Sequence, residues 1–220
     1  MRISSIIHLP LNLLWGLIAI LMLASKGFSI LFRSAFSELR VYLTLKLHLP
    51  KKTYHIIKNV RLPTETSSKI IDYIIVSRYG LFMIQTKNMK GWIYAGQNQK
   101  QWTHKLHKRT RLFPNPLHES FDHIISLEGC LNIDVNTIQS VIVFDQNCEF
   151  KTTMPANATK ARGCVNYIKL FSKKIYNENQ VQRLVADINR GHLTNNIRAN
   201  REHVQHVRDI FSKRVQPKAR

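Results

Sequence analysis

The chain has 220 residues, of which 44% are hydrophobic, so it is long enough to bury a core and its composition excludes a disordered protein. It carries 33 Lys and Arg against 13 Asp and Glu, a net charge of +20, which is typical of proteins that bind a polyanion or an anionic membrane; general solubility is the alternative. Its three cysteines lack C-x-x-C spacing, which argues against a zinc site or a disulfide framework and favours a reducing compartment.

The N-terminal segment is apolar, because residues 3–25 contain no Asp, Glu, Lys or Arg. A helix of about 20 apolar residues crosses a bilayer core, so residues 6–25 predict one membrane helix. A signal peptide cleaved near Ala24 and a buried helix are the alternatives. Positive charge is heavier on the C-terminal side of this segment, at Lys26, Arg33 and Arg40. We therefore expect a single-pass protein of the inner (cytoplasmic) membrane whose C-terminal domain lies in the cytoplasm.

The rest of the chain predicts strands flanked by helices. Apolar residues recur at steps of three and four from Gly27 to Leu49, which indicates an amphipathic helix that Pro50 ends. Apolar and alternating runs predict strands at residues 54–60, 69–77, 81–87 and 91–95, around residue 102 and at 140–144. Helical spacing predicts helices at residues 116–131, after a basic loop, and from about residue 177 to 214.

The segment from Ile70 to Gly91 places polar side chains where the chain is most apolar. Asp72 stands inside the first strand of a predicted hairpin, and Gln85 and Lys87 stand at the end of the second. Charged side chains are rarely buried unless they are paired or bound to a metal. An Asp at a strand edge and a solvated Lys are the ordinary alternatives, but the cluster favours a functional site.

These residue types fit a hard divalent cation, which binds carboxylate, amide and carbonyl oxygens. Asp72 and Gln85 offer such oxygens, and Glu38 adds a carboxylate if its helix packs beside the hairpin; a surface Glu is the alternative. Lys87 shares a strand face with Gln85, since strand side chains alternate. It could activate a water molecule or stabilise charge on a phosphate. Together these groups predict metal-assisted phosphodiester hydrolysis.

The order of motifs between Ser37 and Phe144 carries a resemblance. It includes S-E-L, Y-H-I-I-K-N-V-R-L-P, I-D-Y-I-I-V-S-R-Y-G-L-F-M-I-Q-T-K-N, G-W-I and N-P-L. This order resembles the nuclease-related domain (NERD) family, which is similar to the PD-(D/E)xK nuclease superfamily. The resemblance implies a restriction-endonuclease-like mixed sheet flanked by helices. It also implies catalytic roles for Glu38, Asp72, Gln85 and Lys87, with Mg²⁺ or Mn²⁺ held by the first three.

Two positions depart from the family pattern. The family usually has Gly-Glu where this chain has Ser37 and Glu38, and it usually has Glu at the position of Gln85. The amide keeps an oxygen ligand but removes one negative charge, which weakens affinity for a cation. A Gln-x-Lys form also resembles the Mrr-type restriction endonucleases.

The segment from Thr86 to Arg111 is basic and contains no acid. Beside the site it could hold a phosphate backbone, with an affinity that falls as salt rises. Trp92, Tyr94 and Trp102 lie among these charges, where packing in a core is favoured over stacking on bases. The candidate nucleic-acid-binding residues are Lys90, Lys100, Lys105, Lys108, Arg109 and Arg111.

We expect an anchor at residues 1–26, a NERD-like nuclease core at 27–150 and a basic, mainly helical extension of the same domain at 151–220. The favoured function is a membrane-tethered, Mg²⁺-dependent deoxyribonuclease of the PD-(D/E)xK type with a variant Gln-x-Lys motif. DNA is favoured over RNA as the partner. The alternative is a catalytically degenerate scaffold that binds nucleic acid or anionic lipid.

Overall fold

The computed structural model of the chain describes residues 36–62, 69–96 and 98–189. The chain divides into two compact units, Met1–Leu39 and Arg40–Arg220, and all labelled strands and helices belong to the second. The membrane helix predicted at residues 6–25 lies outside the described residues. Within them, no helix has both the length and the apolar character needed to cross a bilayer.

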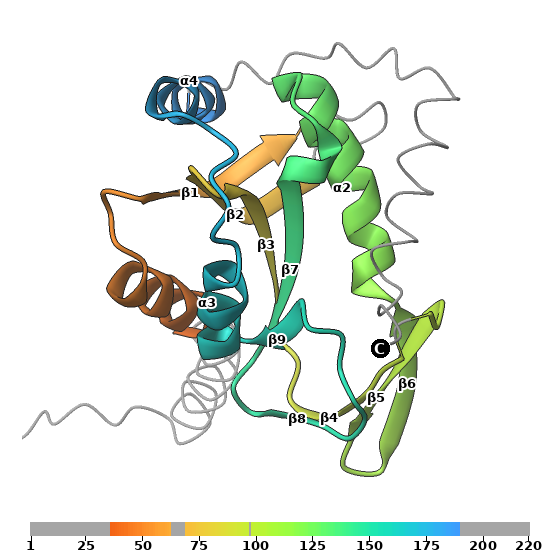
Figure 1. Cartoon of the computed structure of the whole chain (residues 1–220). Coiled ribbons are helices and arrows are strands. Elements are labelled where there is room, and N and C mark those ends of the chain that lie inside the picture. Colours follow the sequence, from red (N-terminus) through yellow and green to blue (C-terminus); the bar gives the residue numbers. More distant parts are fainter. Residues whose placement is uncertain (1–35, 63–68, 97, 190–220) are drawn as a thin grey trace, which may run out of the picture. The chain divides into compact units, whose positions relative to one another are not determined.

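Along the described chain, a helix precedes six consecutive strands, and a second helix, three further strands and two final helices follow (Figure 1). A helix covers residues 36–48 and ends before Pro50, as expected. The strands are β1 (Tyr54–Leu62), β2 (Lys69–Ser77), β3 (Gly80–Lys87), β4 (Gly91–Tyr94), β5 (Gln101–Leu106), β6 (Arg109–Pro114), β7 (Ile138–Phe144), β8 (Cys148–Phe150) and β9 (Ala158–Lys160). The helices are α2 (Pro116–Leu131), α3 (Ala161–Lys169) and α4 (Glu178–Asn189), with a 3-10 turn at Val135–Thr137.

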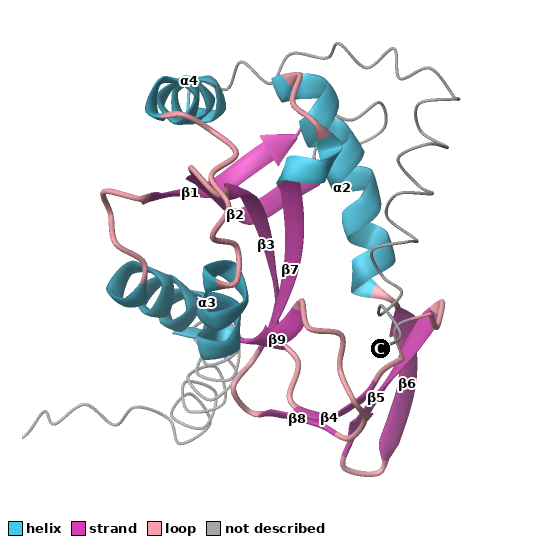
Figure 2. Cartoon of the chain, viewed as in Figure 1, coloured by secondary structure: helices cyan, strands magenta, loops and turns pink. Residues whose placement is uncertain are grey.

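The strands form two mixed sheets (Figure 2). The first has the order β1-β2-β3-β7-β9, with antiparallel pairs from β1 to β3 and parallel pairs from β3 to β9. The second has the order β6-β5-β4-β8 and is antiparallel except where β4 pairs with β8. Both sheets are therefore mixed, in agreement with the expected α/β class.

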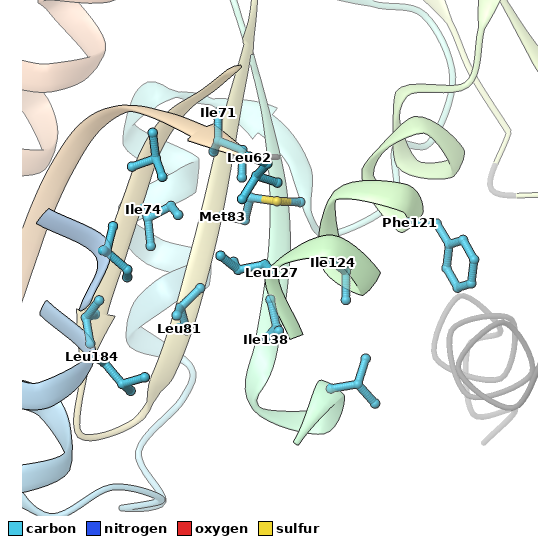
Figure 3. Packing of buried hydrophobic residues seen from close by; sticks show 14 of the residues in the cluster. Leu62, Ile71, Ile74, Leu81, Met83, Phe121, Ile124, Leu127, Ile138 and Leu184 are labelled. Atoms are coloured by element: carbon cyan, nitrogen blue, oxygen red, sulfur yellow. The ribbon is translucent and has the colours of Figure 1, made fainter. Parts of the chain in front are cut away.

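Helices cover both faces of the first sheet. On one face, α2 and α4 bury side chains such as Leu127 and Leu184, and Figure 3 shows Leu127 beside Leu81 of β3 and Ile138 of β7. On the other face, α3 and the N-terminal helix, with Leu49 just after it, pack against strand residues that include Phe82. A third cluster joins β7 and the start of α2 to the second sheet through the buried Trp102.

Four elements were not expected from the sequence. The basic loop before α2 contains β6, whose residues are almost all exposed and so show no apolar alternation. Helix α3 has nine residues and no side-chain cap at Lys160, so the usual start signal is absent. The short strands β8 and β9 have three residues each, below the length at which a pattern is readable.

Helix α2 begins and ends where the sequence predicts. The Asn115 side chain accepts a hydrogen bond from Leu117 N at 3.0 Å, and Pro116 follows it at the first helical position. Asn132 ends the helix in the left-handed conformation, with φ of 49°. The reading of Asn115 and Pro116 as a helix start is confirmed, and it fixes where the first turn of α2 stands.

Candidate active site

Strands β2 and β3 part at Asp72. The last residue pair of their ladder is Tyr73 with Ile84. Beyond it, β2 stays paired with β1 as far as Lys69, and β3 stays paired with β7 as far as Lys87. The sheet therefore forks between these strands, and the predicted site residues Asp72, Gln85 and Lys87 lie at the fork.

The backbone opposite Asp72 changes conformation at the same point. The β1–β2 register pairs Lys58 with Tyr73 and Val60 with Ile71, leaving Asn59 and Asp72 out of the pairing. Asn59 has φ of 52°, a left-handed conformation that Asn tolerates better than most residues. The side-chain alternation of β2 shifts here, since Ile71 and Ile74, three apart, share one core cluster. The strand is thus kinked at the residue that carries the carboxylate.

The Asp72 carboxylate accepts a hydrogen bond from a backbone N–H group that has no strand partner at the fork. Its Oδ2 accepts hydrogen bonds from Thr86 N at 2.5 Å and from Thr86 Oγ1 at 2.7 Å. Two donors on one oxygen fix the carboxylate orientation. Asp72 Oδ1 has no protein partner within the part of the chain that the structure describes.

Gln85, the residue before Thr86, has a buried side-chain oxygen. By strand alternation its side chain lies on the α2 face of β3, as do Leu81 and Met83. Gln85 Oε1 is buried and accepts no hydrogen bond in the described structure. Leaving a buried amide oxygen unpaired costs about 1–3 kcal/mol, so a water molecule or a ligand is expected to bind it.

Lys87 points to the same face and is held by a residue that the sequence did not reveal. Its Nζ lies 2.8 Å from Glu119 Oε2 in the first turn of α2. The lysine side chain is 24% exposed and the glutamate side chain 38% exposed, so the ion pair lies at the edge of the core. An acid in the first turn of a helix is common because it suits the helix dipole, so spacing alone gives no functional signal.

Glu38 lies in a different compact unit from Asp72, Gln85 and Lys87. It is an exposed residue of the helix at 36–48 and belongs to the unit Met1–Leu39. Asp72, Gln85 and Lys87 belong to the unit Arg40–Arg220, so the role of Glu38 stays a prediction.

The free side-chain oxygens at the fork are of the type that a hard divalent cation binds. Asp72 Oδ1 and Gln85 Oε1 are oxygens without protein partners among residues 36–62, 69–96 and 98–189. The same ranges contain no group of three or more His, Cys, Asp or Glu residues that could hold a metal. A cation here would therefore depend on a mixed set that includes the amide of Gln85.

The basic residues after Lys87 divide between two faces of the hairpin formed by β5 and β6. On one face, the register pairs His104 with Arg111 and Leu106 with Arg109. These four residues, with His107 and Lys108 of the turn, line a cavity of about 630 Å³. His104 Nε2 lies 2.5 Å from Lys90 O, which joins this face to the connection that leaves β3.

The opposite face of the hairpin carries a different set of groups. Lys105 Nζ lies 5.3 Å from the ring centroid of Trp92, and Lys151 Nζ lies 4.6 Å from it. Trp92 is 40% exposed, whereas Trp102 is fully buried and stacks on Phe144. The expected core packing is therefore confirmed for Trp102 but not for Trp92. The predicted binding residues Lys90 and Lys100 lie outside the cavity lining, half-buried and exposed respectively.

Sequence comparisons relate the chain to known proteins. The chain is 28% identical, over 174 residues, to an uncharacterized protein of Bacillus anthracis, pXO1-01, and the match covers 75% of this chain and 79% of that protein. No solved structure matches the chain. The nuclease-related domain profile matches residues 33–145, just over half of the chain, and spans β1, the fork, the hairpin and α2. The chain therefore belongs to the nuclease-related domain family, NERD.

Proposed function

We propose that this protein is a metal-dependent nuclease that hydrolyses phosphodiester bonds in DNA. The observation that carries the proposal is the fork, where Asp72, Gln85 and Lys87 come together and the buried Gln85 Oε1 has no described partner. Membership of the nuclease-related domain family supports it. In this proposal the first sheet is a restriction-endonuclease-like core, and the apolar segment at residues 6–25 tethers it to the inner membrane.

The residues at the fork have separate tasks in this reaction. Asp72 and Gln85 would hold Mg²⁺ or Mn²⁺, which would supply Lewis acidity and lower the pKa of an attacking water. Asp72 is pre-oriented, because both Thr86 donors fix its Oδ2 and leave Oδ1 for binding. Lys87 places an ammonium group on the Gln85 face, where it stabilises the negative charge that grows on the phosphate in the transition state.

The cavity face of the hairpin gives this reaction a route for substrate. Arg109 and Arg111 carry guanidinium groups that suit phosphate oxygens, and both line the cavity. Lys90, whose carbonyl contacts His104, follows Lys87 by three residues, so their Cα atoms are at most about 11 Å apart. A phosphate backbone that follows this face therefore passes close to the fork. A concave, arginine-lined surface favours a nucleic acid over a flat lipid surface.

The test is cleavage by the purified full-length chain of labelled duplex DNA, single-stranded DNA and RNA, with Mg²⁺, Mn²⁺ or EDTA. We expect metal-dependent cleavage of DNA that falls at least about 100-fold in Asp72→Asn and Lys87→Met. Lys52→Met, at an exposed residue of the turn before β1, is the matched control and should cleave as wild type does.

Two results would contradict the proposal. Salt-dependent DNA binding without cleavage under any metal would identify a nucleic-acid-binding protein with a degenerate site. Stronger binding to anionic vesicles than to DNA, again without cleavage, would identify a lipid-binding scaffold. Equal cleavage by wild type and both fork variants would mean that the protein is a nuclease but that its active site is not at the fork.

A further inference from the structure

A residue outside the family pattern also brings negative charge to the fork. Gln85 contributes an amide where the pattern has a carboxylate, so β3 itself brings no negative charge to the site. Helix α2 brings one on the same face, because Glu119 Oε2 is paired with Lys87 Nζ at 2.8 Å. We propose that Glu119 is the carboxylate that replaces the one missing at Gln85 and that it binds the divalent cation; this inference depends on the proposed metal site.

The position of Glu119 is fixed by its helix start. Asn115 is fully buried, its Oδ1 accepts from Leu117 N at 3.0 Å, and its Nδ2 donates to Gln99 O at 2.9 Å. Leu117 is also buried, in the cluster that joins α2 to β7 and the second sheet. Glu119 is therefore carried by a rigid first turn rather than by a loop, as a binding group requires.

The Glu119 carboxylate reaches the face of β3 that also carries Gln85. Gln85 and Lys87 are two residues apart on one strand, so their Cβ atoms point to one face at about 6.5–7 Å separation. The Glu119 carboxylate reaches Lys87 on that face. Only Oε2 is engaged, since Glu119 Oε1 has no partner in the described ranges. At the fork, three oxygens of the described residues have no hydrogen-bond partner: this one, Gln85 Oε1 and Asp72 Oδ1.

The charge balance also favours this assignment. The charges of Asp72 and Lys87 cancel, so a divalent cation held by Asp72 and a neutral amide alone would lie in a weakly attractive field. With Glu119 the group carries one net negative charge, which attracts the cation. The loaded site then carries one net positive charge, which matches the single negative charge of a phosphodiester. Ligand charge strongly tunes the affinity of oxygen sites for divalent cations.

The alternative role for Glu119 is to orient Lys87 without touching the cation. The two roles separate in Mn²⁺ binding measured by calorimetry and by electron paramagnetic resonance, with the full-length chain and no nucleic acid. The variants are Glu119→Gln, the double variant Gln85→Glu with Glu119→Gln, and the control Glu128→Gln. Glu128 lies on the same helix, nine residues and about 13 Å further along its axis.

We expect Glu119→Gln to weaken Mn²⁺ binding about 10- to 100-fold. The double variant moves the carboxylate back to β3 and should recover affinity to within about threefold of wild type, and Glu128→Gln should bind as wild type. Far-UV circular dichroism and thermal unfolding establish that each variant is folded. Recovery by the double variant is the decisive result, because a residue that only orients Lys87 cannot be replaced from position 85.

Unchanged Mn²⁺ affinity in Glu119→Gln would overturn the assignment, and so would a double variant that binds as weakly as the single one. These outcomes leave the nuclease proposal intact. Absence of Mn²⁺ binding by wild type at millimolar concentrations would instead remove the metal site itself. The two failures are therefore distinguishable.

Discussion

Asp72 takes the place of a strand neighbour for Thr86: its Oδ2 accepts from the backbone N of Thr86 at 2.5 Å and from its Oγ1 at 2.7 Å. Continuing the β2–β3 register would place Ile71 opposite Thr86, but the two strands have already parted after Tyr73 and Ile84. One carboxylate thus has a structural oxygen, which stabilises the fork, and a second oxygen left for chemistry.

Substitutions at Asp72 should therefore separate stability from activity. Asp72→Ala leaves Thr86 N without an acceptor and should lower the free energy of unfolding by about 1–3 kcal/mol. Asp72→Asn keeps an acceptor oxygen of the same shape and should cost less than about 1.5 kcal/mol, while cleavage is lost in both. Urea unfolding and a cleavage assay on the same preparations check this. Equal destabilisation by the two variants would contradict the structural role of Oδ2.

Much of the fold could be predicted because its signals are local. Two apolar runs flank Arg78, Tyr79 and Gly80, and the hairpin β2–β3 forms there, with Gly80 in a conformation of φ 134°. Asn115 followed by proline marks the start of α2 because capping is a property of neighbouring residues. The strand β6 gave no such signal, since its residues face solvent on a hairpin that only pairing with β5 defines.

The candidate site could be predicted only in part, for the same reason. Asp72, Gln85 and Lys87 stand out because polar groups interrupt an apolar pattern. Glu119 does not, because an acid in the first helical turn satisfies the helix dipole without any tertiary contact. Its link to Lys87 arises from packing between α2 and the sheet, which sequence spacing does not encode.

The two faces of the β5–β6 hairpin should differ in nucleic-acid binding. Arg109→Gln with Arg111→Gln removes two charges from the cavity face, and Lys105→Gln removes one from the opposite face. We expect the arginine double variant to weaken DNA binding and to reduce the slope of log K against log salt by about 0.9 for each lost phosphate contact. Lys105→Gln should leave the slope unchanged. The measurement is fluorescence anisotropy across a salt series, and equal slopes for all proteins would contradict the assignment of faces.

Two glycines should respond to alanine in opposite directions. Gly91 has φ of 87°, and a Cβ there would lie 2.6 Å from Lys105 O, so Gly91→Ala should lower the free energy of unfolding by about 1–3 kcal/mol. Gly129 lies in α2, and a Cβ there would have nothing within 4 Å. Gly129→Ala should therefore raise the free energy of unfolding by about 0.5–1 kcal/mol. Urea unfolding measures both; stabilisation by Gly91→Ala would show that the close approach of β4 to β5 is not constrained.

The buried thiols should make the protein less stable in alkali. Burial raises the pKa of Cys164 to about 12 and that of Cys148 to about 11, from an ordinary value of 9.0. Well below pH 9 both thiols are protonated in the folded and unfolded states, so they add no pH dependence there. Above it the unfolded chain loses these protons first, and the free energy of unfolding should fall by up to about 1.4 kcal/mol per pH unit for each thiol.

Cys164→Ala isolates the contribution of one thiol. The variant loses buried contacts in α3 and should be less stable than wild type at neutral pH. Between pH 9 and about 10.5, however, its free energy of unfolding should fall less steeply, because one proton fewer separates the folded and unfolded states. Urea unfolding of both proteins at a series of pH values gives the two slopes. Parallel curves would mean that Cys164 ionises equally readily in the folded and unfolded chain, which its burial between α3 and the first sheet argues against.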